Sequence, residues 1–305
     1  MKCLSSKRAS PRADGFQMVF TIGLILFLAS LLLVLLSKIR KVYDRNRQSI
    51  RRDFLQQASL RASTRDLAKI DVYLTAWNDQ LSIGPVVQEF KSLELVDRVI
   101  VIDNDSTDQT REEALRAGAE VVVERNRGYG QVVYRALTEG SLGKHPWFAV
   151  CEGDGTFLAR DLHKLMQYTQ EASVVNGTRI VEQLREVETQ LTNFMFFGNF
   201  FAAKILEVKH LGKGTFTDLG TTYKLVHAKT IGKNLHLFSP EVNLEFNAHF
   251  LDRCLSSNLR VVEVPINFRA RIGESKGGNR SNLIAIRVGL KMLKGILFGW
   301  KFYGR

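Results

Sequence analysis

Hydrophobic and polar positions alternate in a regular order along the middle of this chain. Short apolar runs precede longer segments in which apolar residues recur every three or four positions. The first pattern is typical of buried strands and the second of amphipathic helices. Repeated strand–helix units favour an α/β domain with a mostly parallel central sheet, and we place this domain at residues 69–280.

The pattern predicts individual elements within this domain. Strands are predicted at residues 70–75, 98–102, 120–123, 147–151, 174–176, 221–226 and 260–264. Helices are predicted at residues 81–95, 107–117, 129–139, 159–172, 182–208 and 240–255, with glycine stops at Gly118 and Gly140. The aromatic-rich part of segment 182–208 fits either a buried core helix or a helix lying on a bilayer.

The N-terminal part has a different pattern, because no charged residue occurs between positions 16 and 36. About 20 apolar residues suffice to cross the hydrocarbon layer of a bilayer. This run is longer than the apolar region of a signal peptide. We therefore predict a basic tail at 1–15, an uncleaved single-pass transmembrane anchor at 16–37 and a helical juxtamembrane linker at 38–68. The C-terminal flank of the anchor is the more basic one, which predicts a cytoplasmic domain.

Charge is distributed unevenly along the chain. Residues 1–65 contain 13 Lys/Arg and 3 Asp/Glu, residues 66–269 contain 22 and 27, and residues 270–305 contain 8 and 1. Basic ends around a mildly acidic middle favour contact with anionic lipid headgroups and argue against a nucleic-acid partner. The three cysteines lack the spacing of a zinc site or a disulfide framework.

The last segment, residues 281–305, is predicted to be an amphipathic helix. Its basic side chains Arg287, Lys291, Lys294 and Lys301 fall within one narrow arc, and apolar residues cover the remainder. This arrangement favours a helix that lies in the membrane interface. A helix that packs on the domain is the alternative.

Polar segments that contain glycine or asparagine follow four predicted strands, at residues 77–79, 103–106, 126–128 and 152–154. In open α/β sheets, ligands bind outside the carboxyl ends of the strands. We therefore predict that these segments form one polar crevice. Helix capping accounts for Ser106 and Asp108, whereas Asp103 at its strand end could accept the ring N–H of a uracil or guanine.

Two acidic residues in this set, Glu152 and Asp154, are separated by a single glycine. Carboxylates at this spacing can share one hard cation, whose other positions are filled by water and substrate phosphates. The loop therefore predicts a metal–diphosphate site. A solvated turn is the other interpretation, because acids and glycines are common in turns.

A basic segment follows the last predicted strand. Arg269, Arg271 and Lys276 cluster there with glycines and Ser275. Fork-shaped Arg donors and a Lys suit phosphate oxygens, so we predict phosphate binding. The alternative is a basic surface loop.

Over residues 70–280 the chain resembles inverting family 2 glycosyltransferases with a GT-A fold, in particular the polyprenol-phosphate (dolichol-phosphate) sugar transferases. The matching segments are residues 76–79 (Ala-Trp-Asn-Asp), 101–108 (Val-Ile-Asp-Asn-Asp-Ser-Thr-Asp), 126–130 (Asn-Arg-Gly-Tyr-Gly), 152–154 (Glu-Gly-Asp), 177–179 (Gly-Thr-Arg), 218–220 (Asp-Leu-Gly), 263–266 (Glu-Val-Pro-Ile) and 271–276 (Arg-Ile-Gly-Glu-Ser-Lys). Trp77 replaces the family's Tyr, Asp79 its Glu and Glu152 the first Asp of its Asp-x-Asp motif.

The resemblance implies transfer of a sugar from a UDP- or GDP-sugar to a polyprenyl or dolichyl phosphate with Mg²⁺ or Mn²⁺, and it assigns roles to residues of this chain. The expected nucleotide-sugar contacts are Trp77, Asp79, Asp103, Asn104, Gly130, Glu152 and Asp154. The expected acceptor or phosphate contacts are Arg179, Arg269, Arg271, Ser275 and Lys276. Asp154, Arg271 and Lys276 are the expected catalytic residues, and Glu152 and Asp154 the expected metal ligands.

Two other functions stay open at this point. A family 2 transferase could act on another lipid or on a glycan, since the nucleotide half of the site would be shared. A membrane scaffold with a decayed site would account for Asp79 and Glu152, but the intact block at 271–276 argues against it. Whether copies of the chain form a homo-oligomer is also open.

Overall fold

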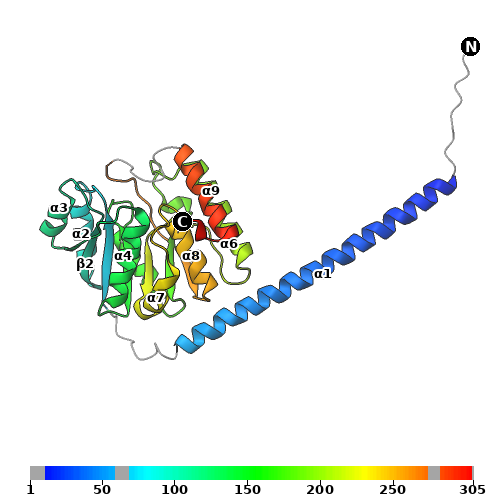
Figure 1. The fold of residues 1–305 in the computed structure, drawn as a ribbon, viewed down its shortest axis with the longest axis horizontal. Helices are drawn as coiled ribbons and strands as arrows, with labels where there is room; N and C mark the ends of the chain where they lie inside the picture. The colour runs from blue at the N-terminus through cyan, green and yellow to red at the C-terminus, as the bar shows by residue number, and fades with distance from the viewer. Residues whose placement is uncertain (1–10, 59–68, 274–281, 304–305) are drawn as a thin grey trace, which may run out of the picture.

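A computed structural model describes residues 11–58, 69–273 and 282–303 of the chain. Figure 1 shows an α/β unit and one long helix, α1 (Pro11–Ala58), that extends away from it. This helix includes the predicted anchor and part of the predicted linker. Within the described ranges, no helix is both long enough and apolar enough to cross a membrane.

Seven strands of the described chain form one sheet with the order β3-β2-β1-β4-β6-β5-β7. The strands are β1 (Ile70–Ala76), β2 (Val96–Asp103), β3 (Glu120–Val123), β4 (Trp147–Glu152), β5 (Val174–Thr178), β6 (Lys224–His227) and β7 (Val261–Pro265). All pairs are parallel except the two made by β6, which confirms the predicted mostly parallel sheet. Thr75 pairs with Glu152 and Ala76 with Asp103, so the segments that follow these strands emerge at the same edge.

Helices cover both faces of the sheet, as the side-chain alternation of its strands requires. They are α2 (Ile83–Lys91), α3 (Thr110–Arg116), α4 (Tyr129–Leu142), α5 (Leu162–Met166), α6 (Asn193–Lys209), α7 (Ala228–Asn234), α8 (Phe246–Ser256) and α9 (Asn282–Phe298), with short 3₁₀ turns at Ala159–Asp161, Glu182–Leu184, Leu235–Leu237 and Lys301–Tyr303. In β1, Val72 and Leu74 join the core beneath α2, α3 and α5. Tyr73, between them, joins the core beneath α4, α7 and α8.

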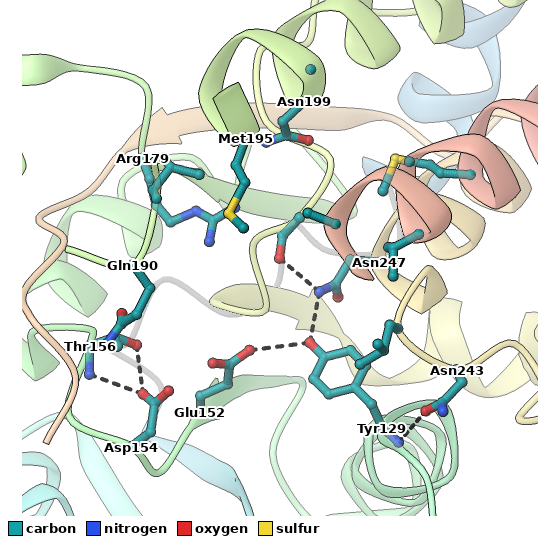
Figure 2. A pocket seen from close by; sticks show the side chains of 18 of the residues that line it. Tyr129, Glu152, Asp154, Thr156, Arg179, Gln190, Met195, Asn199, Asn243 and Asn247 are labelled. Carbon is teal, nitrogen blue, oxygen red and sulfur yellow. Dashed lines mark hydrogen bonds between the residues drawn. The ribbon is translucent and has the colours of Figure 1, made fainter. Parts of the chain in front are cut away.

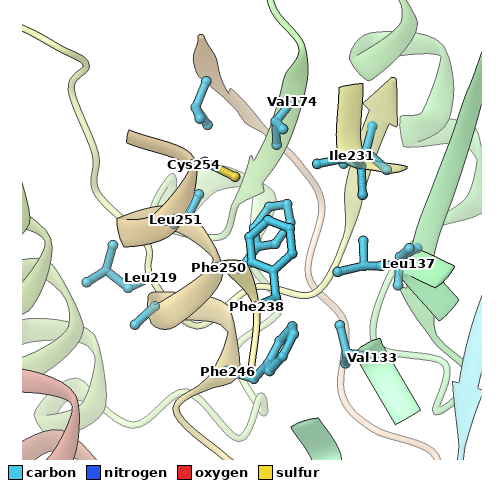
Figure 3. Packing of buried hydrophobic residues seen from close by; sticks show 14 of the residues in the cluster. Val133, Leu137, Val174, Leu219, Ile231, Phe238, Phe246, Phe250, Leu251 and Cys254 are labelled. Atoms are coloured by element: carbon cyan, nitrogen blue, oxygen red, sulfur yellow. The ribbon is translucent and has the colours of Figure 1, made fainter. Parts of the chain in front are cut away.

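The core beneath α4, α7 and α8 fixes the position of α8, which contributes a residue to the site described below. Phe238 and Phe250 stack with ring centroids 4.9 Å apart, and both are buried against Leu137 of α4 (Figure 3). Burying an aromatic side chain of this size contributes roughly 1.5–3 kcal/mol. The packing therefore holds α8 firmly against the sheet.

Several predicted helices are shorter than expected. The segment 159–172 forms only a 3₁₀ turn and α5, and the helix expected from 240 begins at Phe246. The helix expected over 182–208 begins at Asn193, where the side chain of Thr192 accepts a hydrogen bond from the Met195 N–H. Such a cap satisfies one of the free N–H groups at a helix start. The C-terminal helix ends at Phe298, followed by Gly299 at φ +88°.

The predicted helix stop at Gly140 is wrong, because α4 continues to Leu142. A Cβ atom on Gly140 would lie 2.2 Å from the ring of Phe148 on β4. The glycine therefore permits close contact between helix and sheet. Local sequence cannot distinguish this use of glycine from a helix stop, because the partner lies on another element.

The C-terminal helix α9 packs on α6 and α8. Its inner face therefore agrees with the alternative prediction, a helix that packs on the domain. Met292 and Ile296 are buried there. Beyond its end, the indole N–H of Trp300 donates to Asp252 on α8 at 2.7 Å, and Asp252 also accepts from Lys209 of α6. These contacts fix α6, α8 and α9 relative to one another.

Candidate active site

A cavity of about 850 Å³ lies beyond the carboxyl ends of β1 and β4. One half of its wall is polar and comes from the sheet edge, where Asp79, Glu152, Asp154, Arg179 and Arg271 line it. The other half is apolar and lies between α6 and α9. The predicted crevice and the two helices therefore form one continuous space.

Asp154 is buried in the polar half and is held by three donors. Its Oδ1 accepts from the N–H and the hydroxyl of Thr156, and its Oδ2 accepts from Arg271 Nη1 at 2.9 Å. Burial and the nearby charge of Glu152 raise the pKa of Asp154 to about 6, although Arg271 and Thr156 oppose the shift. This carboxylate thus carries negative charge that its surroundings compensate only in part, so its chemistry fits a hard divalent cation.

Arg271 joins two loops that are far apart in the sequence. Its Nη2 donates to Asp79 Oδ1 at 2.7 Å, while Nη1 contacts Asp154. Asp79 Oδ2 in turn accepts from the backbone N–H of Trp77, whose side chain lies at the rim and is 40% exposed. The structure therefore brings together four of the predicted residues: Trp77, Asp79, Asp154 and Arg271.

Arg179 also reaches the cavity, from the end of β5. Its Nε and Nη2 bind the two oxygens of buried Asp218 at 2.7 and 2.8 Å. Burial opposes ionisation of Asp218, but Arg179 and backbone N–H groups lower the pKa of this carboxyl overall. The Asp-Leu-Gly segment at 218–220 thus anchors Arg179. This ion pair connects two separate motifs of the family resemblance, residues 177–179 and 218–220.

Asp103 and Asn104 hold loops of the site in place, and of the two only Asn104 lines the cavity. Asp103 is fully buried, accepts from Arg111 Nε at 2.5 Å and does not line the cavity. Asn104 lines it, but its amide donates to Glu124 and Asn126 carbonyls and accepts from the Gly128 N–H. Both side chains therefore organise loops, and this arrangement does not favour the predicted contact of Asp103 with a base. Ser106, expected as a cap, instead accepts from the Asn78 N–H, and α3 starts at Thr110.

Three further predictions differ from the structure or lie beyond it. Arg269 does not line the cavity, because its guanidinium binds Glu89 at 2.9 Å and the carbonyls of Gly155 and Phe157. Gly130 is buried where a Cβ would lie 1.9 Å from the Val242 carbonyl, so it serves close packing. The predicted residues Ser275 and Lys276 lie outside the described residues.

Three site residues were not predicted. Tyr129 and Asn247 line the cavity, and Thr222 lies just behind them. Thr222 and Tyr129 both donate to Glu152 Oε1, at 2.5 and 3.3 Å. The position of Tyr129 within the glycine-containing segment 126–130 was a signal that could have identified it. Asn247 has no such signal, since only the packing of α8 brings it to the site (Figure 2).

The comparison with protein families decides the classification. Residues 71–229 match the model described as Glycosyl transferase family 2, which is more than half of the chain. The chain belongs to this family.

Two relatives from Haloferax volcanii extend the match. Glycosyltransferase AglJ is 28% identical over 223 residues, which covers 73% of this chain and 67% of that protein. A dolichyl-phosphate hexose transferase is 26% identical over 206 residues, which covers 67% of this chain and 85% of that protein. The family 2 assignment therefore holds over most of the α/β unit.

Solved structures support the fold of this family 2 domain. Glucosyl-3-phosphoglycerate synthase from Mycobacterium tuberculosis, in complex with Mn²⁺, UDP-glucose and phosphoglyceric acid, aligns with a TM-score of 0.54 at 16% identity. The alignment covers 75% of this chain and 79% of that one. The α/β fold with its mostly parallel sheet is thus GT-A-like, as the sequence predicted.

A second acidic group of this glycosyltransferase domain could also hold a metal. Ligand atoms of Asp71, Asp97 and His145 lie within 4.8 Å of one another. They are at the starts of β1 and β2 and just before β4, which is the opposite edge of the sheet from the cavity. This group therefore belongs to a different part of the molecule from Asp154.

Proposed function

We propose that this family 2 glycosyltransferase moves a sugar from a UDP- or GDP-sugar to a polyprenyl phosphate at a membrane surface. The observation that carries the proposal is the two-sided cavity. Its polar half offers carboxylates and arginines to phosphate groups, and its apolar half opens directly from there. An acceptor with a phosphate head and a hydrocarbon chain matches both halves.

The apolar half is lined by residues of two helices. Phe194, Phe201 and Ala202 come from α6, and Gly289 and Leu290 come from α9. Removing a prenyl chain from water against such a surface is favourable by roughly 25 cal/mol per Å² buried. A small soluble acceptor would leave this surface unused, so the groove favours a lipid.

The polar half supplies the groups that the donor needs. Asp154 would hold Mg²⁺ or Mn²⁺, because the charge of this carboxylate is only partly compensated. The negative charge of Glu152 lies beside Asp154. When bound, such an ion offsets the charge that develops on the leaving nucleoside diphosphate. The Mn²⁺ and UDP-glucose in the synthase structure support this choice of ligands. Trp77 at the rim has an aromatic face on which a nucleobase could stack.

The acceptor would react without a strong base in the protein. Its phosphate is largely ionised at neutral pH, because the second pKa of a phosphate monoester is about 6. Arg179, together with Arg271, Ser275 and Lys276, would hold this phosphate or the donor diphosphate. A phosphate oxygen then bonds to the anomeric carbon as the bond from that carbon to the diphosphate breaks, and the configuration inverts.

Membrane attachment is the remaining part of the proposal. The uncharged run at 16–36 lies within α1, and its apolar side chains from Leu24 to Leu36 are exposed. On α9, exposed Leu283 and Phe298 accompany exposed Arg287 and Lys291, which suits an interface with anionic headgroups. We infer a single-pass protein with its catalytic domain in the cytoplasm, because the domain side of the run is the more basic flank.

The groove can be tested by filling it. A Cβ on Gly289 would meet nothing within 4 Å, so Gly289→Phe places a ring in the groove without displacing the helix. We expect the KM for a long polyprenyl phosphate to rise about tenfold, which corresponds to about 1.4 kcal/mol of lost contact. The KM for the nucleotide-sugar should stay within about twofold, because the donor lies in the polar half.

The matched control is Val208→Phe, which adds a ring to a position on α6 that is 74% exposed and does not line the cavity. This variant should behave like the wild type. An unchanged KM for the lipid in Gly289→Phe, with a normal rate, would contradict the proposed acceptor. A family 2 transferase acting on a glycan would give that result.

A further inference from the structure

A buried lysine lies behind the polar half of the cavity. Lys224, the first residue of β6, is fully buried and does not line the cavity. Its Nζ donates to the carbonyls of Thr221 and Thr222 and to Asn247 Oδ1, at 2.9, 3.1 and 3.0 Å. Burial lowers the pKa of Lys224 to about 7. A buried ammonium is costly unless its three donors are used, and here all three are.

This lysine and the carbonyl of Gly220 together determine the orientation of the Asn247 amide. The Nζ of Lys224 donates to Oδ1 of Asn247, and the Gly220 carbonyl, which can only accept, lies 3.0 Å from Nδ2. With one hydrogen on the Gly220 carbonyl, Nδ2 directs its other hydrogen toward the cavity, where Tyr129 Oη lies at 2.7 Å and Thr222 Oγ1 at 3.2 Å. Figure 2 shows the Asn247 amide directed at Tyr129, and Tyr129 directed at Glu152.

The line of hydrogen bonds ends on one oxygen of Glu152. The phenol of Tyr129 accepts from Asn247 Nδ2 and has one O–H to donate. Tyr129 and Thr222 contact each other, and both donate to Glu152 Oε1. The two hydrogen bonds that described residues donate to this carboxylate thus reach Oε1. Among the residues that the structure describes, none donates to Oε2, so its lone pairs can accept from a ligand.

The place of this cluster indicates what that ligand is. Figure 2 shows Glu152 between Asp154 and Tyr129, with Asn247 above Tyr129 in this view, toward the red ribbon of α9. Under the proposed function, the donor diphosphate lies at Asp154 and the lipid chain lies in the apolar groove. The sugar that is transferred must lie between them, beside the cluster. A carboxylate oxygen and a phenol are groups that bind sugar hydroxyls.

We propose that Tyr129 and Asn247, oriented by Lys224, select the sugar of the donor by presenting Glu152 and the phenol oxygen to its hydroxyl groups. Lys224 is the positioning residue, and Tyr129 is the residue that contacts the sugar. The inference rests on the proposed function and adds the group that discriminates between hexoses. Sites that hydrogen-bond a substrate hydroxyl can reject analogues that lack it or invert it much more strongly than apolar pockets can.

The test measures donor binding without any acceptor. The full-length protein in detergent with Mn²⁺ is titrated calorimetrically with the nucleoside diphosphate alone and with nucleotide-hexoses that differ at one hydroxyl. Tyr129→Phe removes one oxygen and keeps the ring. We expect its Kd for the nucleoside diphosphate to stay within about twofold, while its Kd for the preferred donor rises about tenfold and its preference between epimers falls about tenfold.

Two variants accompany this measurement. Tyr168→Phe changes a tyrosine that is 41% exposed and outside the cavity, and it should match the wild type. Lys224→Met should reproduce the loss of epimer preference through Asn247. Because this variant also removes a buried hydrogen-bond donor, its fold is checked by thermal unfolding, and Tyr129→Phe decides the question if Lys224→Met does not fold.

Equal weakening of nucleoside diphosphate and donor in Tyr129→Phe would overturn the inference, because it would place Tyr129 at the nucleotide. An unchanged preference between epimers would overturn it as well. In both cases the proposed transfer to a lipid would stand, since lipid dependence is measured separately. A wild-type protein that binds no nucleotide-sugar would overturn both proposals.

Discussion

Acidic side chains gather at both edges of the central sheet, and the two groups differ in what surrounds them. At the amino edge, Arg98 binds both oxygens of Asp71, and Lys144 lies 2.5 Å from Asp97. Hydrogen bonds from Lys144 and His145 lower the pKa of Asp97 to about 2. The protein's own bases therefore stabilise the negative charge of this group.

At the carboxyl edge the balance is the opposite. Burial and Glu152 raise the pKa of Asp154 to about 6, and Arg271 divides its donors between Asp154 and Asp79. Such partly compensated charge in a cavity is typical of functional sites, whereas fully paired charge is typical of structural ones. Ligand spacing alone therefore does not identify a metal site. The compensation of the charge and the presence of a cavity separate the two edges.

The largest difference in turnover between the two edges should appear when Arg271 or Arg98 is removed. Arg271→Ala takes a cation from the cavity, and we expect turnover to fall by about 10²-fold or more. Arg98→Ala takes a comparable cation from the amino edge and should leave turnover within about twofold. It should lower the free energy of unfolding by about 1–2 kcal/mol, because Arg98 is one-third exposed and water screens the pair.

Steady-state turnover and chemical denaturation of the two variants provide this comparison. Loss of activity in Arg98→Ala at unchanged fold would show that the amino edge takes part in the reaction. A fully active Arg271→Ala would remove Arg271 from the site.

A smaller effect is expected from pH. The protonated fraction of Asp154 rises as pH falls through about 6, and a metal ion binds the ionised carboxylate. Binding of Mn²⁺ alone, followed by the electron paramagnetic resonance signal of the free ion, should weaken about tenfold per pH unit below about 6. Asp97, with its pKa of about 2, would stay ionised over the same range. Affinity that stays constant down to pH 4 would show that Mn²⁺ does not bind at Asp154.

Much of the fold could be predicted because it depends on local periodicity. The strand–helix alternation was sufficient for the mostly parallel sheet and for the edge that carries the site. The helix ends were less predictable where tertiary contacts decide them. Gly140 continues a helix because it packs against Phe148, and α6 starts late because Thr192 caps it.

The site could be predicted in part, for a related reason. Asp79 and Asp154 follow strand ends and do line the cavity. Asp103 has the same local setting, yet it pairs with Arg111 away from the cavity. Asn247 could not be predicted, because its position depends on the packing of α8 and on Lys224. Strand ends thus indicate the edge of the sheet, and only the packed structure indicates which side chains face the ligand.

The most direct test of the account follows the release of nucleoside diphosphate by the full-length protein in detergent. The protein is given Mn²⁺, a panel of UDP- and GDP-sugars and a polyprenyl phosphate, and Asp154→Asn and Asp97→Asn are measured in parallel. We predict release that requires the lipid, falls by about 10³-fold in Asp154→Asn and is unchanged in Asp97→Asn. Release that is equal without the lipid, or that persists in Asp154→Asn, would contradict this prediction.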